Sequence, residues 1–325
     1  MPGRRALITG IDGQDGSYLA EQLVEEGSEV VGMVRPPLSR ELPNLAAVRD
    51  RIALLPGDLL DPPSLAAAVR EVAPQELYHL AAPTFVPASW QDPTETVAAI
   101  ATGTAALLGA VRALEADADT ETGVWVATSS EIFGDSGESP QTERSPMRPR
   151  SPYGAAKVAA HALVGAMRSR HGMFACSGIT YNHESPRRPA HFLPRKVTRG
   201  AAAISLGLED ELVLGDLDAV RDWSHAADVV RAARLALRHD EPGDYVIASG
   251  VGRTVRDLVG AAFAHVGLDP DEHVRVDAAF VRPPEATPPV GDPTRARETL
   301  GWRPEVSFEA LVAEMVDADL AALRG

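Results

Sequence analysis

Tyr153 and Lys157 are the first residues in this chain whose types and spacing could do chemistry. Side chains four residues apart on a helix lie on the same face, so the Lys157 ammonium group can approach the Tyr153 phenol. A nearby positive charge favours the ionised phenol, whose ordinary pKa is near ~10, and we expect Tyr153 to act as a base at neutral pH. Because this spacing is commonplace on helices, the pair needs support from the rest of the chain.

Ser129 and Glu131 supply that support, since they follow the apolar run Val124–Ala127. Residues two apart at the end of a strand point to the same side. One base is enough to oxidise an alcohol, whereas an added carboxylate indicates proton abstraction from carbon and elimination of water. A glutamate after a strand is more often a solvated cap, and the combination with the first pair favours chemistry. We therefore predict Ser129, Glu131, Tyr153 and Lys157 as the catalytic residues.

The elements that must position these side chains alternate between short apolar runs and helical patterns. This alternation predicts an α/β fold of the Rossmann type, a doubly wound parallel sheet with helices on both faces. The expected strands are Ala6–Thr9, Glu29–Val34, Ile52–Pro56, Glu76–Leu80, Val124–Ala127, Ser177–Tyr181 and Asp244–Ile247. The expected helices are Gly16–Glu26, Pro63–Val72, Thr94–Glu115 and Pro152–His171. We predict a dinucleotide-binding domain over residues 1–177, to which 218–250 return, and a smaller interleaved α/β substrate domain from 178–217 and 251–325.

A glycine-rich loop, Gly10-Ile11-Asp12-Gly13-Gln14-Asp15-Gly16, joins the first expected strand to the first expected helix. Gly10 permits a tight turn, Gly13 lets the backbone approach a pyrophosphate, and Gly16 allows close packing of helix on strand. The helix N-terminus adds partial positive charge. A glycine turn between any strand and helix is the alternative, but the flanking elements favour a cofactor site that includes Gln14 and Asp15.

Arg35 ends the second expected strand, where an acidic residue would mark NAD by holding the ribose 2′-hydroxyl. A guanidinium there favours a 2′-phosphate, so we predict NADP as the cofactor, with a solvated surface arginine as the alternative. Asp58 and Leu59 follow the third strand and are placed to contact an adenine. Leu80 and Ala81 follow the fourth, where backbone can run beside a cofactor. Loop capping and simple close packing are the alternatives for these four residues.

Composition excludes several classes of function. With 31 basic and 46 acidic residues, the net charge of −15 argues against nucleic-acid and anionic-membrane binding. No apolar run approaches the ~20 residues that span a bilayer, and the lone Cys176 cannot form an intrachain disulfide. We expect a soluble, cytoplasmic protein. His183 and Glu184 are adjacent and point apart, and no other spacing fits a metal site, so we expect no metal.

Several longer motifs carry a resemblance to a known family. In chain order they are Ile8–Gly10 through Gly16–Glu21, Pro149–Gly154, Tyr181–Arg188, Arg195–Arg199, Leu214–Ala219, Arg221–Trp223 and Arg282–Glu285. On these motifs the chain resembles the extended short-chain dehydrogenases/reductases, and within them the GDP-mannose 4,6-dehydratase family, over nearly its whole length. The blocks Asn182–Arg188 and Leu217–Trp223 are far more specific than the glycine loop or the Tyr/Lys pair.

The resemblance implies an internal redox cycle that dehydrates GDP-mannose to GDP-4-keto-6-deoxymannose, with bound NADP recycled. Tyr153 would take the C4 hydroxyl proton while Ser129 orients that hydroxyl, and Glu131 would move the C5 proton to the departing C6 hydroxyl. Basic residues also recur in the loops of the second half, which in so acidic a chain indicates a local diphosphate site. The implied contacts to a GDP-hexose are Ser89, Asn182, Arg188, Lys196, Arg221, Arg282 and Glu285.

Three departures from the family pattern stand out. Ser129 replaces a threonine, Pro83-Thr84-Phe85 stands where Gln-Ser-His is common, and the segment after Arg35 is shorter than usual. An epimerase or another dehydratase acting on a different nucleotide-sugar is one alternative, although a 4-epimerase has no need of Glu131. A non-catalytic NADP-binding scaffold is another. The apolar helices predicted at Thr94–Glu115 and Pro152–His171 favour a homodimer or homotetramer.

Overall fold

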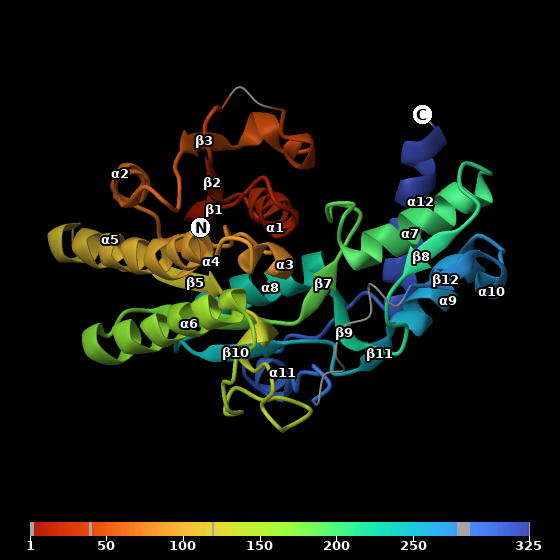
Figure 1. Ribbon diagram of the computed structural model, residues 1–325. Coiled ribbons are helices and arrows are strands. Elements are labelled where there is room, and N and C mark those ends of the chain that lie inside the picture. Colours follow the sequence, from red (N-terminus) through yellow and green to blue (C-terminus); the bar gives the residue numbers. More distant parts are fainter. Residues whose placement is uncertain (1–2, 39–40, 119, 278–286, 325) are drawn as a thin grey trace.

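The computed structural model describes residues 3–38, 41–118, 120–277 and 287–324 (Figure 1). Its largest element is a seven-stranded sheet with the order β3-β2-β1-β4-β5-β6-β10, in which every neighbouring pair of strands is parallel. The strands are β1 Arg5–Thr9, β2 Glu29–Val34, β3 Ala53–Pro56, β4 Glu76–His79, β5 Gly123–Ala127, β6 Ala175–Thr180 and β10 Asp244–Ile247. The predicted doubly wound parallel sheet is confirmed.

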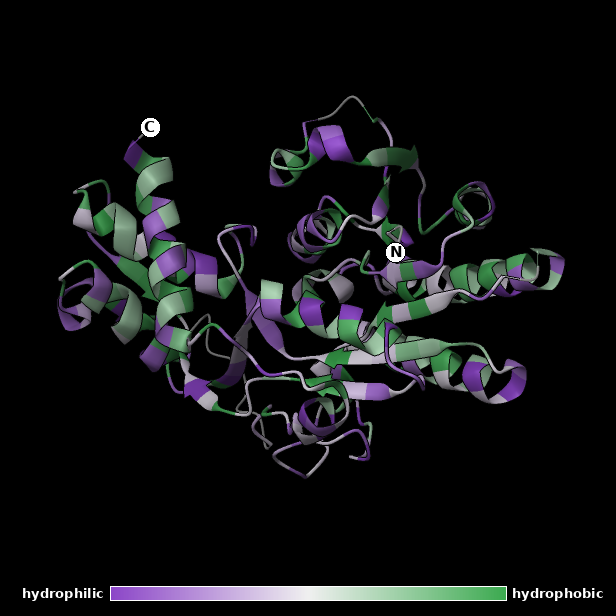
Figure 2. Ribbon diagram, turned by 180° about the vertical axis from the view of Figure 1, so that it is seen from behind, coloured by the Kyte–Doolittle hydropathy of each residue, from purple (hydrophilic) through white to green (hydrophobic). Residues whose placement is uncertain are grey.

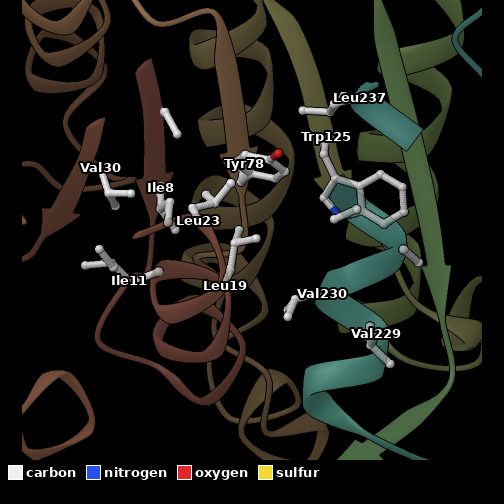
Figure 3. Close-up of a cluster of buried hydrophobic side chains, with 14 of the residues drawn as sticks. Ile8, Ile11, Leu19, Leu23, Val30, Tyr78, Trp125, Val229, Val230 and Leu237 are labelled. Atoms are coloured by element: carbon white, nitrogen blue, oxygen red, sulfur yellow. The ribbon is translucent and has the colours of Figure 1, made fainter. Parts of the chain in front are cut away.

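Helices cover both faces of this sheet. The helices and helical turns of this part are α1 Gln14–Glu25, η1 Pro43–Leu45, η2 Arg49–Arg51, α2 Pro62–Val72, α3 Val86–Ser89, α4 Pro93–Val97, η3 Ala98–Thr102, α5 Gly103–Ala118, η4 Ser130–Ile132, α6 Pro152–His171, α8 Ala226–Leu237 and α11 Thr294–Leu300. Figure 3 shows Leu19 and Leu23 of α1 and Val230 of α8 in the same cluster as Tyr78 and Trp125 of the strands. The other face carries α2, α5 and α6 in a second cluster.

A second region lies beyond β6 in the chain. It contains a three-stranded sheet in the order β11-β9-β7 and a two-stranded sheet of β12 and β8. Its elements are β7 Asn182–Glu184, α7 Leu193–Ser205, β8 Leu212–Leu214, β9 Val220–His225, β11 Gly252–Thr254, α9 Val255–His265, α10 Pro270–His273, β12 Val274–Val276 and α12 Phe308–Arg324. In Figure 2 the C-terminal helix α12 carries both hydrophobic and hydrophilic residues, and its apolar face packs on α7 and α9.

The chain crosses between the two regions more than once. α8 and β10 return to the large sheet, while β9, which also lies within 218–250, pairs in the three-stranded sheet. Ala296 of α11 and Trp302 also pack in the cluster of the large sheet, although they lie within the predicted substrate domain. Side-chain packing thus ties the two regions together, and the domain division stays a prediction.

The predicted helix Thr94–Glu115 is part of a longer helical segment, Pro93–Ala118, interrupted by a π-helical turn at Ala98–Thr102. This segment is long and apolar enough by length and composition to cross a membrane, in contrast to the expectation from apolar runs. One such helix is weak evidence. Leu107, Leu108 and Val111 pack in the core against α2 and the sheet, as in the core helix of a globular protein.

Candidate active site

The site begins where β5 ends and α6 starts. Ser129 precedes the short turn η4, and its hydroxyl accepts a hydrogen bond from the Glu131 backbone N–H at 3.3 Å. Ser151 caps α6 in the same way, accepting from Gly154 N at 3.0 Å. A Cβ on Gly154 would lie 2.6 Å from the Glu131 carbonyl oxygen, so only glycine lets α6 approach this close. The Ser-Pro-Tyr-Gly sequence therefore brings Tyr153 to the end of β5.

Tyr153 and Lys157 share a face of α6 and are both buried. The Lys157 Nζ lies 5.7 Å from the centre of the Tyr153 ring and donates to the Ala127 carbonyl at 2.6 Å. Burial raises the pKa of Tyr153 to about 12, because a buried phenolate is poorly solvated, although the hydrogen bond to Ser129 lowers it. Burial also lowers the pKa of Lys157 to about 8. The expectation that Lys157 lowers the Tyr153 pKa is thus wrong for the protein alone, since desolvation dominates both groups.

Glu131 follows β5 in the turn that packs against the start of α6. Its carboxylate raises the pKa of Tyr153 further, and the guanidinium of Arg188 lowers it, so both charges lie close enough to affect the phenol. Glu131 itself is partly exposed. The four predicted catalytic residues are therefore brought together where β5 ends and α6 begins, with the Lys157 ammonium one helical turn from the Tyr153 phenol.

The glycine loop fits a dinucleotide cofactor. Gly10 has a φ of +71° and a Cβ there would lie 2.8 Å from the Ala81 backbone, while a Cβ on Gly16 would lie 2.2 Å from the Gly10 carbonyl oxygen. Gly13 is the residue before α1, and no side chain in the described chain caps the helix there. The N-terminus of α1 therefore faces the loop with backbone N–H groups suited to phosphate.

The segment after β6 contacts the first turns of α1, which sequence reasoning missed. His183 Nε2 lies 2.8 Å from Asp15, and the Ser185 hydroxyl donates to Gln14 at 2.8 Å. We name residues Ser185–Arg188 the arginine loop. Arg187 donates to Ser17 at 2.9 Å and to Glu21 at 2.6 Å, and its guanidinium stacks 3.9 Å above the Tyr18 ring. The only sign of these contacts in the sequence was the family-specific block Asn182–Arg188, and this block did not indicate which residues the side chains would contact.

His183 and Asp15 titrate as a pair. Burial lowers the pKa of His183, but the charge and hydrogen bond of Asp15 raise it more. Burial raises the pKa of Asp15, yet His183 lowers it overall. Because His183 Nδ1 also lies 2.7 Å from the Tyr181 carbonyl, both ring nitrogens face acceptors, which favours the protonated ring. Among the described residues no group of His, Cys, Asp and Glu could hold a metal ion.

The other predicted cofactor residues line the ends of the first strands. Arg35 follows β2 and is exposed. Asp58 caps its own loop by accepting from Leu60 N at 2.9 Å, and the Leu59 side chain is buried in the core. Thr9 Oγ1 accepts from the backbone N–H of Leu80 and Ala81, both at 3.2 Å, which fixes that segment beside the glycine loop. Their contacts with a cofactor stay predictions.

The predicted substrate residues are less closely grouped. Arg188 pairs with the buried Glu184 at 3.1 Å and stacks on Phe192, while Asn182 lies on β7. Lys196 and Arg221 donate to the backbone carbonyls of Val213 and Val220, both at 2.6 Å. The Ser89 hydroxyl donates to Val86 O, and its side chain is buried. Arg282 and Glu285 lie outside the described residues.

The parallel sheet, the glycine loop and the Ser, Tyr and Lys side chains at the end of β5 and the start of α6 define an extended short-chain dehydrogenase/reductase. Solved structures of this type share the fold. One is a UDP-glucose 4-epimerase of Thermotoga maritima, at a TM-score of 0.85 and 24% identity, covering 98% of this chain and 99% of that one. Another is a dTDP-glucose 4,6-dehydratase of Streptomyces venezuelae solved with NAD, at a TM-score of 0.82 and 26% identity, covering 97% and 96%.

The family within this class follows from the sequence comparisons. The family model described as GDP-mannose 4,6 dehydratase matches residues 7–315. A GDP-mannose 4,6 dehydratase of Arabidopsis thaliana is 42% identical over 98% of this chain and 90% of the relative. The human one is 41% identical over 99% and 93%. The chain belongs to the GDP-mannose 4,6-dehydratase family.

Proposed function

We propose that this protein is a lyase that dehydrates GDP-D-mannose to GDP-4-keto-6-deoxy-D-mannose by an internal redox cycle. The observation that carries the proposal is that Glu131 lies against the first turn of α6 beside Tyr153, where a Cβ on Gly154 would meet its carbonyl oxygen at 2.6 Å. The charge of Glu131 also raises the pKa of the Tyr153 phenol. A carboxylate at this point adds a second acid/base to the Ser129, Tyr153 and Lys157 set that oxidises alcohols. Family membership supports GDP-mannose as the substrate.

The residues divide the proton transfers between them. Ser129, whose hydroxyl is close enough to the Tyr153 phenol to lower its pKa, orients the C4 hydroxyl, whose proton passes to Tyr153. The resulting 4-ketone makes the C5 proton acidic, and Glu131 removes it and delivers it to the departing C6 hydroxyl, which leaves as water. Tyr153 then returns a proton to C5. Lys157, fixed by the Ala127 carbonyl, holds the positive charge beside the phenol.

We propose NADP as the resident cofactor, held by the glycine loop, the N-terminus of α1 and Arg35. Bound there, NADP would supply a reversible hydride acceptor for the sugar, and the positive charge of its oxidised ring would favour the Tyr153 phenolate. Arg35 is exposed at the end of β2, as a residue that reads a 2′-phosphate must be. Among the solved neighbours, the dTDP-glucose 4,6-dehydratase carries NAD and another structure carries NADPH, which supports a nicotinamide cofactor, while the choice of NADP rests on Arg35.

We also propose that Asn182, Arg188, Lys196 and Arg221 bind the GDP portion, and that the protein acts as a cytoplasmic homodimer or homotetramer. The basic side chains can bind a diphosphate by charge-assisted hydrogen bonds. The rest of the chain, with an overall net charge of −15, would repel such an anion. Ser89, Arg282 and Glu285 complete the proposed substrate contacts. The segment Pro93–Ala118 and helix α6 pack side by side and supply the assembly face.

The test is incubation with GDP-mannose and catalytic NADP, followed by mass spectrometry. We expect loss of one water without added NADPH. Glu131→Gln should lower the dehydration rate by about 10²–10⁴-fold while NADP still binds, because a positioned acid/base contributes that much. Unchanged mass with a shifted sugar NMR signal would favour a 4-epimerase instead. Full turnover by Glu131→Gln would show that Glu131 is not the acid/base that transfers the C5 proton.

A further inference from the structure

Asp319 is a fully buried carboxylate on the C-terminal helix α12, and the catalytic scheme has no use for it. Its Oδ1 accepts a hydrogen bond from Arg195 at 2.5 Å, and its Oδ2 accepts from the Thr198 hydroxyl at 2.8 Å. Both partners lie on α7. Burying a carboxylate is costly unless it is paired and hydrogen-bonded, and apolar side chains would serve helix packing equally well. The charge at Asp319 therefore indicates a task beyond packing.

Arg195 connects Asp319 to the arginine loop. The same guanidinium that binds Asp319 also donates to the carbonyl oxygens of Pro186 and Arg188, the latter at 3.1 Å. These carbonyls lie in a loop between β7 and α7, outside any strand ladder. A planar guanidinium with its donors in a fixed fork can hold several acceptors in one geometry. Asp319 thus fixes Arg195, and Arg195 fixes the backbone of the loop.

The other side of the arginine loop holds the cofactor helix. Ser185 donates to Gln14 and Arg187 donates to Ser17 and Glu21, all on α1. The first turn of α1 carries the phosphate-binding N–H groups described above. Polar contacts therefore run without a break from α12, through Arg195 and the arginine loop, to the helix that faces the cofactor.

We propose that Asp319 is a positioning residue for cofactor binding, which acts through Arg195 on the arginine loop and thereby on α1. This inference rests on the proposed use of a dinucleotide cofactor. It extends the site to a helix that contributes no group to the chemistry. It also couples the second region of the molecule to the cofactor, so cofactor affinity depends on how α12 is packed.

Asp319→Asn tests the proposal, with Asp317→Asn as the matched control. Asp317 lies on the same helix, is largely exposed and pairs with His265, so its loss should leave cofactor affinity within about twofold. We expect Asp319→Asn to raise the NADPH dissociation constant about tenfold, within the range typical of coupled sites. The measurement is NADPH fluorescence titration on variants that melt well above the assay temperature. At saturating NADP, kcat should stay within about threefold.

A second substitution separates positioning from general loss of stability. If Asp319 acts through the arginine loop, Arg187→Met should weaken NADPH binding too, and the double variant should be scarcely weaker than the worse single one. Equal NADPH affinity in Asp319→Asn and Asp317→Asn, or full additivity with Arg187→Met, would overturn the proposal. A wild-type protein that binds no NADPH would instead contradict the proposed function.

Hydrogen exchange on the wild-type protein decides the question if Asp319→Asn does not fold. Because coupling between two sites is reciprocal, NADP should protect amides of α12 around Asp319 and of the arginine loop. Amides of α9, which packs on α12 but takes no part in the chain of polar contacts through Arg195, serve as the internal control. Protection of α1 alone, with α12 unchanged, would contradict the coupling.

Discussion

The glycine loop and the arginine loop meet on the same helix, α1, but they are built in opposite ways. At the glycine loop, backbone touches backbone, and a single added carbon at Gly16 would lie 2.2 Å from a carbonyl oxygen. At the arginine loop, side chains such as Ser185 and Arg187 reach across 166 to 171 residues of sequence to partners on α1. Added atoms should therefore damage the first loop, and removed atoms the second.

The largest effect should follow from Gly16→Ala. The new methyl group must displace the Gly10 carbonyl, which costs about 1–3 kcal/mol in the free energy of unfolding. The displaced backbone would also narrow the space in which the glycine loop binds the pyrophosphate. We expect NADPH affinity to fall by about 100-fold or more, which is ~3 kcal/mol. Thermal melting and NADPH titration measure the two losses.

Gly109→Ala is the matched control for that change. Gly109 lies on an exposed face of α5, where an added Cβ meets nothing within 4 Å. Alanine should stabilise the helix there by about 0.5–1 kcal/mol and leave cofactor affinity unchanged. Equal behaviour of the two variants would show that the glycine loop is not built by backbone contact.

The same difference explains what the sequence could predict. The glycine loop, the large parallel sheet and the Ser129 to Lys157 cluster follow from local spacing and periodicity, and the structure brings those residues together. The contacts of His183 and Arg187 could not be predicted, because a partner more than 160 residues away leaves no local pattern. Sequence spacing also missed desolvation, which reverses the expected pKa shift of Tyr153. Burial is a property of the whole fold.

A smaller, pH-dependent effect should mark the contact between His183 and Asp15. The folded-state pKa of His183 is raised, so its stabilising contribution is complete below the unfolded value and is lost as pH rises through the folded one. The pKa of Asp15 is lowered, so that carboxylate stays ionised throughout this range. The nearby Arg188 opposes protonation of His183 without reversing the shift. Between pH 6 and 8.5 the wild type should therefore lose about 1 kcal/mol more stability than His183→Gln.

Urea unfolding at both pH values measures this loss. The control is His265→Gln, which removes an exposed His–Asp pair of the same 2.8 Å length. Since exposed pairs contribute little, its pH dependence should match the wild type closely. An identical slope in wild type and His183→Gln would mean that the ring gains no proton from Asp15, and that this contact between the two regions carries no charge.

The smallest effect should come from Arg35→Glu, which tests the predicted contact with the 2′-phosphate of the cofactor. Because Arg35 is exposed, the substitution should leave thermal stability unchanged. The carboxylate repels a 2′-phosphate and can accept hydrogen bonds from a ribose, so the NADPH-to-NADH affinity ratio should fall about threefold, which is ~0.6 kcal/mol. Arg70→Glu, an exposed change of the same charge on α2, controls for the added negative charge. If the NADPH-to-NADH affinity ratio fell equally in both variants, the preference for NADPH would depend on overall charge, and Arg35 would then be a solvated surface residue.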